Sequence, residues 1–508
     1  MLRGRLRGIA VLALAAGLVA GTAAAQQPTE SLTITYPEEG TVFPPGIVAP
    51  IIRWEDPSPA DAWQVTIEAD GLAIPISASV DARQWRPGSE QWAAVQAHSL
   101  EGARITVSRA AQGAPAARAG VTITTSPDPV DAPIFYREVP IPLEHAIANR
   151  PLIRWRLGEV TDQDEPRTVL EGMETCANCH SFSADGRTLA MDVDYTRGKD
   201  SYAITAVEER TTITEDDLIS WADYYGGATQ RRTFGLLPRV SPDGRWVIST
   251  VDEKTIHVPL PDLYCSQLFF PIQGVLVVYD REGDTFRALP GADDKAFAHT
   301  SAAWSPDGSE VIFARAPAHQ LSKPQPREDA VVPRSEAQVF VSGEKKFRFD
   351  LYRVPFNGGE GGEARPVEGA HDNGKSNYFA RYSPDGEWIV FCQADSFLFN
   401  RPDATLFIMP SSGGTPRRMR CNRPGRMNSW HSWSPSGRWM VFSSKANGPY
   451  TQLWLTHIDE QGDDSPPVLL EGFTPPDRAA NLPEFVDIEP HLLQSIEVSD
   501  EIREFKGY

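Results

Sequence analysis

The chain has 508 residues, of which 41% are hydrophobic and 23% are charged. This length exceeds one ordinary core and the hydrophobic fraction is typical of a globular protein, so we expect two domains and no large-scale disorder. The formal net charge of -20 argues against nucleic acid or an anionic membrane surface as a partner.

Residues 1–25 have the pattern of a secretory signal peptide. Three Arg precede an apolar stretch at residues 9–20, and Ala23–Ala25 form a small-residue cleavage site. The apolar stretch is short and rich in Ala and Gly, which disfavours a retained membrane anchor, and no later segment is apolar and long enough to span a bilayer. The sequence therefore predicts cleavage, a net charge of -23 without those Arg, and a periplasmic location.

Residues 26–125 contain short strands of alternating polarity separated by Gly and Pro turns. Trp63–Ile67 and Arg104–Val107 are two of these strands. The pattern predicts a small β-sandwich of the immunoglobulin or fibronectin type. A stiff linker with three Pro at residues 126–133 cannot pair in a sheet and marks the boundary to the next domain.

The rest of the chain contains an internal repeat. A Ser-Pro-Asp-Gly type of turn recurs between two short apolar strands, and two further strands usually precede the next copy. Glycine in such a turn supplies a positive φ, and four strands per repeat make one blade of a β-propeller. Insertions near residues 254–273 and 318–346 explain the uneven spacing. The copies lie at residues 183–186, 241–244, 305–308, 383–386 and 434–437.

Two segments without the turn motif complete the architecture. Ile134–Trp155 and Leu482–Ile488 are expected to pair as a sixth blade that joins the two ends of the propeller and removes its sheet edges. On these repeats, residues 134–490 resemble a TolB-type six-bladed propeller, with residues 491–508 as a C-terminal tail. The resemblance implies an all-β fold and leaves function open, because propellers serve as binding platforms, enzymes and electron-transfer scaffolds.

One motif carries chemistry. Cys176-Ala177-Asn178-Cys179-His180 has the C-x-x-C-H pattern of c-type haem attachment, in which two thiols bond to the porphyrin and the histidine binds iron. The segment 168–175 before it has helix-forming composition. A redox-active dithiol, a zinc site and a structural disulfide are the alternatives. The sequence predicts one covalent haem c, held by Cys176 and Cys179 and ligated by His180.

The repeat register relates His180 to a second histidine. His180 lies six residues before Gly186, and His431 lies six residues before Gly437. Both imidazoles are therefore expected on equivalent innermost strands beside the central channel. His431 is the leading candidate for the opposite axial position of the iron, or else lines the channel through hydrogen bonds, and an open sixth position is also compatible with the sequence.

Other residues near the inner strands have a weaker claim to the site. His299 and Met427 are alternative axial ligands. Five aromatic residues flank the same strands and are expected to pack the blades, with a wall beside the haem as the alternative: Trp304, Phe379, Tyr382, Trp430 and Trp433.

The three remaining cysteines lie outside the motif. Cys392 and Cys421 come from one blade and can form a disulfide only if the loop leaving that blade folds back. Cys265 is expected to be buried and inert.

These features leave three functions open. The first is a periplasmic monohaem protein for electron transfer or redox sensing, with an unidentified redox partner. The second is a haem enzyme that acts on a small substrate. The third is a TolB-like protein- or ligand-binding propeller in which the C-x-x-C is structural. The sequence indicates neither the oligomeric state nor the substrate.

Overall fold

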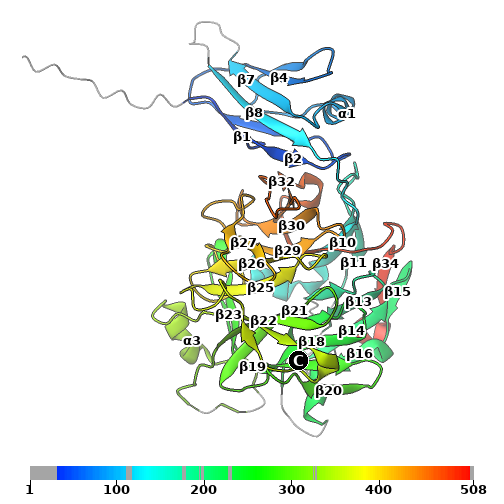
Figure 1. Ribbon diagram of the computed structural model, residues 1–508, viewed down its shortest axis with the longest axis vertical. Coiled ribbons are helices and arrows are strands. Elements are labelled where there is room, and N and C mark those ends of the chain that lie inside the picture. The colour runs from blue at the N-terminus through cyan, green and yellow to red at the C-terminus, as the bar shows by residue number, and fades with distance from the viewer. Residues whose placement is uncertain are drawn as a thin grey trace, which may run out of the picture.

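The protein is described here by a computed structural model. It describes residues 31–109, 117–173, 179–193, 195, 200–226, 232–323, 325–326 and 329–503. The predicted signal peptide and Cys176 lie outside these residues. The N-terminal domain sits at one end of the molecule and the larger C-terminal domain at the other (Figure 1).

The N-terminal domain is a β-sandwich, as predicted. Its strands alternate buried and partly exposed residues, which is the two-residue period of a sheet with one face on a core. One sheet has the order β1 (Thr33–Tyr36), β3 (Ile52–Glu55), β6 (Gln84–Trp85), and the other the order β2 (Thr41–Phe43), β8 (Arg118–Thr125), β7 (Ala103–Arg109), β4 (Trp63–Ala69), β5 (Ile76–Val80), with helix α1 (Ser89–Ala97) beside them.

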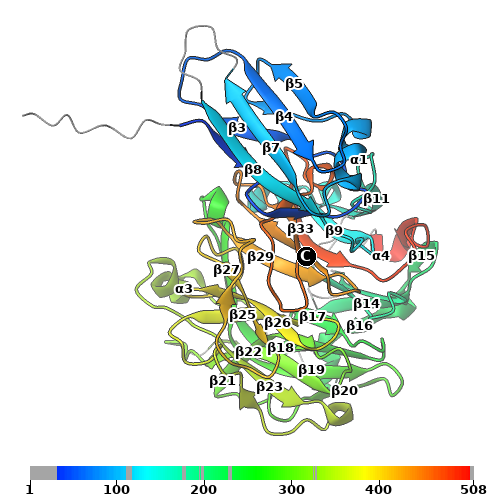
Figure 2. The ribbon, with the colours of Figure 1, turned by 45° about the horizontal axis from the view of Figure 1, so that its top comes forward.

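The C-terminal domain is a six-bladed propeller, which confirms the all-β fold predicted from the repeats. Within the described residues, six groups of four strands radiate from a common centre (Figures 1 and 2). From the innermost strand outwards, the first three blades are β12 (His180–Phe182), β13 (Thr188–Asp192), β14 (Ser201–Ala206), β16 (Leu218–Ser220); β17 (Leu236–Val240), β18 (Trp246–Pro259), β19 (Gln267–Asp280), β20 (Thr285–Ala288); and β21 (Phe297–Trp304), β22 (Glu310–Pro317), β23 (Asp350–Pro355), β24 (Arg365–Pro366).

The fourth, fifth and sixth blades follow the same order. They are β25 (Ser376–Tyr382), β26 (Trp388–Ala394), β27 (Thr405–Pro410), β28 (Arg417–Arg418); β29 (Asn428–Trp433), β30 (Trp439–Ser444), β31 (Gln452–His457), β32 (Val468–Leu469); and β33 (Ala479–Phe485), β9 (Ile134–Val139), β10 (Arg154–Gly158), β11 (Arg167–Leu170).

The repeated tetrapeptides are the turns between the first and second strands of five blades. In the first, the hydroxyl of Ser183 donates to the carboxylate of Asp185 at 2.6 Å and accepts the N–H of Thr188 at 3.0 Å. The turn glycine is left-handed in every copy, with φ of 66° at Gly186 and 71° at Gly437. Other residues are strained in that conformation, which explains the recurrence of glycine at this position.

The sixth blade closes the ring. The late strand β33 is its innermost strand and pairs antiparallel with β9, with Phe485 opposite Ile134 and Ala479 opposite Val139. The predicted closure between the two ends of the propeller is therefore confirmed. The expected helical character of residues 168–175 is wrong for its first part, because Val169 and Leu170 are buried in β11. Pairing with β10 overrides the local propensity there.

The C-terminal segment after residue 490 also packs on the propeller. Strand β34 (Ser495–Val498) pairs parallel with β15 (Arg210–Ile213), and helix α4 (Asp500–Arg503) follows it. Ile496, Val498 and Ile502 are buried in a hydrophobic cluster that the first and sixth blades share. The segment predicted as a tail thus adds apolar side chains to the core.

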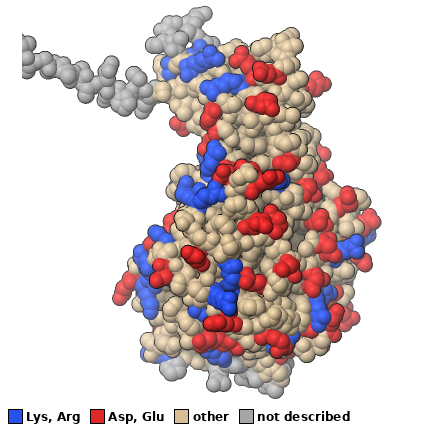
Figure 3. Space-filling model, viewed as in Figure 1, with Lys and Arg blue, Asp and Glu red and all other residues tan. Residues whose placement is uncertain are grey.

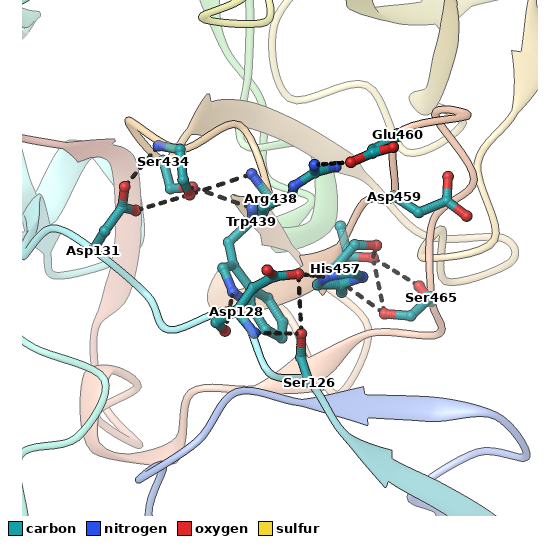
Figure 4. A network of polar contacts seen from close by, with 12 residues as sticks. Ser126, Asp128, Asp131, Ser434, Arg438, Trp439, His457, Asp459, Glu460 and Ser465 are labelled. Atoms are coloured by element: carbon teal, nitrogen blue, oxygen red, sulfur yellow. Dashed lines mark hydrogen bonds and ion pairs between the residues drawn. The ribbon is translucent and has the colours of Figure 1, made fainter. Parts of the chain in front are cut away.

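The two domains share one hydrophobic cluster through the fifth and sixth blades. The hydroxyl of Tyr36 in the sandwich accepts the N–H of Leu469 at 3.0 Å. The linker is held on the fifth blade as well, as Figure 4 shows: Asp128 pairs with Nε2 of His457 at 2.8 Å, and its carbonyl accepts Nε1–H of Trp439 at 3.1 Å. These contacts hold the sandwich on one side of the propeller.

The surface carries many acidic side chains. On the face drawn in Figure 3 they are spread over both domains, with Lys and Arg among them. No helix within the described part of the chain is long and apolar enough to cross a membrane.

Candidate functional site

A central cavity lies where the six inner strands meet. It has about 560 Å³ of empty space, counted together with the solvent at its mouth. In the five blades that have the turn, the cavity residues come from positions four, three and two before the first residue of the turn. The residues four before it are Cys179, Leu237, Ser301, Phe379 and Trp430, and Leu482 takes the corresponding place in the sixth blade.

Five of these inner strands are bulged at the cavity. Their pairing register shifts at this level, and the bulge residue is left-handed with φ between 48° and 57°. Left-handed conformations of residues other than glycine cost about 1–3 kcal/mol each and concentrate at functional sites. The bulge residues are Leu237, Ser301, Phe379, Trp430 and Leu482.

The first blade differs from the other five at this level. Its strand β12 pairs with β13 in regular register from His180 to Phe182, and the carbonyl of Cys179 accepts the N–H of Asp192 at 2.9 Å. Cys179 thus stands where the other blades have their bulge residue, at the wall of the cavity. The C-x-x-C-H motif therefore ends inside the central cavity.

The imidazole of His180 is buried, and its ring nitrogens make no hydrogen bond of standard geometry with the described residues. The residue is 5% exposed. The ring packs edge-on against Phe135 of the sixth blade, with 4.7 Å between centroids. Burial, followed by the charges of Arg239 and Arg137, lowers the pKa of His180 to about 3, and a weak hydrogen bond to the backbone of Leu482 opposes this only in part. The ring is therefore neutral and has a free lone pair, which is the state that ligates a metal.

Cys179 lies beside His180 and has a protonated thiol. Its backbone N–H donates to the carboxylate of Asp192 at 2.9 Å. Burial and the Asp192 carboxylate raise the pKa of Cys179 well above its ordinary value. A redox-active dithiol needs a lowered thiol pKa, so this environment does not favour that alternative. Cys176 lies outside the described residues.

His431 lines the same cavity from the fifth blade, so the structure brings the two register-matched histidines to one cavity. Its Nε2–H donates to the carbonyl of Val390 at 3.0 Å, while Nδ1 has no partner among the described residues. His299 and Met427 do not line the cavity, although both are buried. Of the histidines considered as axial ligands, His431 is the one that faces the cavity with His180.

Two arginines and a glutamate of the cavity were missed by the sequence reasoning. Arg239 and Arg381 stand two residues before the turn in the second and fourth blades, and Glu484 lies in the sixth. The Arg239 guanidinium contacts the Glu484 carboxylate at 3.2 Å. The repeat register that located His180 and His431 also contained the signal for these arginines.

An aromatic cluster lies next to the cavity. Phe379 and Trp430 line it and both contact Phe399, with ring centroids 5.6 and 5.9 Å apart. Phe269, from the long arm formed by β18 and β19, contacts Phe399 at 5.3 Å. Phe399 is left-handed with φ of 65°. Two of the five expected blade-packing aromatics thus belong to the cavity wall, and one predicted insertion supplies part of the adjoining cluster.

The remaining cysteines form no disulfide. Cys392 and Cys421 are both free and buried, and Cys392 Sγ lies 3.3 Å from the hydroxyl of Ser429. The pairing considered from the sequence is therefore not formed. Cys265 is free and buried, as expected.

The side chains at the cavity suit a haem c. Cys179 provides a thiol of the required motif, and His180 provides a neutral imidazole with an unused lone pair. The cavity also has an apolar wall and two guanidinium groups, of which that of Arg239 is already paired with Glu484. Among the described residues, no group of three or more His, Cys, Asp or Glu side chains gathers around one point as a metal site.

Comparisons with known proteins give a fold likeness. No family model matches the chain. The uncharacterized protein Atu1656 of Agrobacterium fabrum is 39% identical over 56 residues, which span 11% of this chain and 17% of that relative's length.

Among solved structures, TolB from Acinetobacter baumannii is similar over 76% of this chain and 79% of its own, with a TM-score of 0.42 and 13% identity. A putative TolB from Agrobacterium tumefaciens covers 70% of this chain and 99% of its own, with a TM-score of 0.36 and 15% identity. An oligogalacturonate lyase in complex with manganese covers 59% and 68%, with a TM-score of 0.37 and 14% identity. The propeller itself is assigned from the six groups of strands and their closure.

Proposed function

We propose that this protein is an exported propeller that carries one covalently attached haem c, bound by Cys176 and Cys179 and ligated through iron by His180. The observation that carries this proposal is the buried, neutral imidazole of His180, the last residue of the attachment motif, whose ring nitrogens make no hydrogen bond of standard geometry within the described part of the chain. A structural histidine in a core normally has its nitrogens satisfied, because an unpaired buried polar atom costs free energy.

The haem would supply one-electron redox chemistry, so the proposed role is electron transfer or redox sensing in the periplasm with an unidentified partner protein. The chain would contribute the environment. Phe135 orients the His180 ring from one side, and the apolar wall that includes Leu237 and Phe379 limits the access of water. Arg239 and Arg381 would place positive charge beside the group.

His431 is the candidate for the opposite axial position. Its Nε2 carries the proton that is donated to Val390, which leaves Nδ1 as the nitrogen with a free lone pair. An open sixth position would instead suit a haem that acts on a small substrate.

A pyridine haemochrome spectrum of the denatured protein tests the proposal. The full chain is expressed with its first 25 residues in a host that attaches haem c. We expect a c-type spectrum that persists after denaturation, a loss of that spectrum in the Cys176→Ser/Cys179→Ser variant, and no change in the matched control Cys392→Ser. A colourless protein that is folded and exported would reject the haem.

The second candidate is a TolB-like binding propeller in which the C-x-x-C is structural. The observation in its favour is the cavity itself, which has strained bulges on five strands and buried polar atoms that have no partner in the described ranges. Propeller channels are common ligand sites. This candidate gains support if the chain is colourless and its cavity binds a small molecule.

A further inference from the structure

The central cavity contains an imbalance of charge. The charged side chains that line it in the described residues are Arg239, Arg381 and Glu484. Glu484 Oε1 accepts from Arg239 at 3.2 Å and from the backbone N–H of Phe182 at 3.2 Å. The carboxylate is therefore engaged with one of the two arginines, and Arg381 is left without an ion-pair partner among the described residues.

The Arg381 guanidinium is only partly satisfied by the protein. Its Nη1 donates to the carbonyl of Ala380 at 2.9 Å, whereas its buried Nε has no acceptor among the described residues. Burial and the positive charge of Arg239 lower the pKa of Arg381 well below its ordinary value, and the charge of the Glu484 carboxylate offsets this only in part. Arg381 as a whole is only partly buried, but a guanidinium whose Nε is buried is stabilised by an anion, and its planar fork matches a carboxylate in particular.

The surroundings of Arg381 restrict the rest of the ligand. The indole Nε1–H of Trp430, a residue that also lines the cavity, is a second buried donor without an acceptor among the described residues. Leu237, Phe379 and Trp430 form an apolar wall that continues into the cluster around Phe399. A ligand that fits both features has a carboxylate at one end and an apolar body.

We infer that Arg381 binds the carboxylate of a ligand with an apolar body in the central cavity. Two sources have this chemistry: a propionate of a haem attached at Cys179, and a free organic acid that enters the channel. The inference requires only the carboxylate, so it stands whether or not the chain carries haem.

Isothermal titration of the full chain with benzoate tests it, with benzamide as the neutral ligand of the same shape. For a free-acid site we expect benzoate to bind and benzamide not to bind. Arg381→Gln should weaken benzoate at least tenfold. Arg417→Gln, on the outermost strand of the same blade, should bind like the parent protein. Arg381→Lys keeps the charge without the fork and should give an intermediate affinity.

A second measurement identifies the other source. If the purified chain is red and binds no benzoate, Arg381→Gln should lower the midpoint potential of the haem, because it removes a positive charge beside a propionate, while Arg417→Gln leaves the potential unchanged. A colourless chain that binds benzoate through Arg381 would reject the haem and keep the carboxylate site. Equal behaviour of Arg381→Gln and the parent protein in both measurements would overturn the inference.

Discussion

The first and fifth blades carry the same residue at the same place and use it differently. In both, a histidine stands three residues before the turn and lines the central cavity. In the fifth blade the residue before it, Trp430, is left-handed at a bulge, and Nε2 of His431 is tied to Val390. In the first blade the strand is regular, and His180 makes no hydrogen bond of standard geometry from its ring among the described residues.

This difference shows which features belong to the repeated blade architecture and which are specific to the candidate site. The turn, the inner strand and the position of the histidine belong to the repeat, so two blades share them. The regular strand and the His180 ring without a standard hydrogen bond among the described residues both occur in the blade that carries the C-x-x-C-H motif. We place the proposed haem ligand in the first blade, because its inner strand is regular at the position where the other five blades have a strained bulge.

The largest expected effect comes from replacing the two histidines. His180→Ala should remove the axial ligand of the proposed haem and abolish the native low-spin spectrum, because alanine has no ring nitrogen that could bind the iron. His431→Ala should retain the covalent haem and the His180 bond but change the spectrum to high-spin. Optical and electron paramagnetic resonance spectra of both variants decide this.

Two results would contradict that comparison. An unchanged spectrum in His180→Ala would remove His180 from the iron. An unchanged spectrum in His431→Ala would reject it as the opposite ligand and leave the rest of the proposal intact.

The next largest effect is a loss of stability on replacing the second residue after the turn glycine. Trp439 in the fifth blade is fully buried and donates to the linker carbonyl of Asp128, whereas the first blade has the partly buried Thr188. Trp439→Ala should lower the free energy of unfolding by about 3–5 kcal/mol through the cavity it leaves. Thr188→Ala should cost less than about 1 kcal/mol. Urea unfolding measures both, and equal losses would show that the linker contact is unimportant.

The turn glycines give a smaller contrast. A Cβ on Gly186 would lie 2.6 Å from the carbonyl oxygen of Asp487, whereas a Cβ on Gly437 would lie no closer than 3.5 Å to Pro384. Both residues are left-handed, which costs alanine about 1–2 kcal/mol. Gly437→Ala should therefore lose that amount, and Gly186→Ala should lose about 1–3 kcal/mol more through overpacking. Equal melting temperatures for the two variants would contradict the tight closure at the first blade.

The smallest effect concerns the linker on the fifth blade. Burial raises the pKa of Asp128, but its hydrogen bond to His457 and the associated charge outweigh burial and leave the pKa below its ordinary value of 3.8. Stability from this carboxylate is therefore present above about pH 4 and is lost as the pH falls through the lower folded value. Because the pair is partly exposed, Asp128→Asn should cost about 0.5 kcal/mol at pH 7.

Thermal unfolding at pH 7 and pH 3 measures this loss. The difference between Asp128→Asn and the parent protein should shrink at pH 3, whereas Asp131→Asn in the same linker serves as the control. A difference that stays constant between the two pH values would show that the Asp128 carboxylate does not contribute.

The architecture was predictable because it is repeated. Each turn glycine reports the same left-handed backbone, and the polarity of the strands repeats with it, so five blades and the closing pair β9 and β33 follow from the chain itself. The error at Arg167–Leu170 has the opposite origin. Local propensity favoured a helix there, and the strand forms because Val169 and Leu170 find a partner strand in β10.

The site was predictable in part. The motif and the register located Cys179, His180 and His431 at the cavity. Arg239 and Arg381 were missed because a lone arginine in a strand has no local signature. Their shared place two residues before the turn was the one signal that could have found them, since their proximity arises from blades more than 140 residues apart in the chain. The bulges at Leu237 and Phe379 were also missed, since nothing in those residue types favours a left-handed backbone.

Peptide mass mapping of the exported protein without reductant tests the central claim most directly. The account predicts that the peptide with Cys176 and Cys179 carries the mass of one haem, while the peptides with Cys392 and Cys421 carry free thiols. A motif peptide with two free thiols or an internal disulfide, isolated from a host that attaches haem to a control cytochrome, would contradict it.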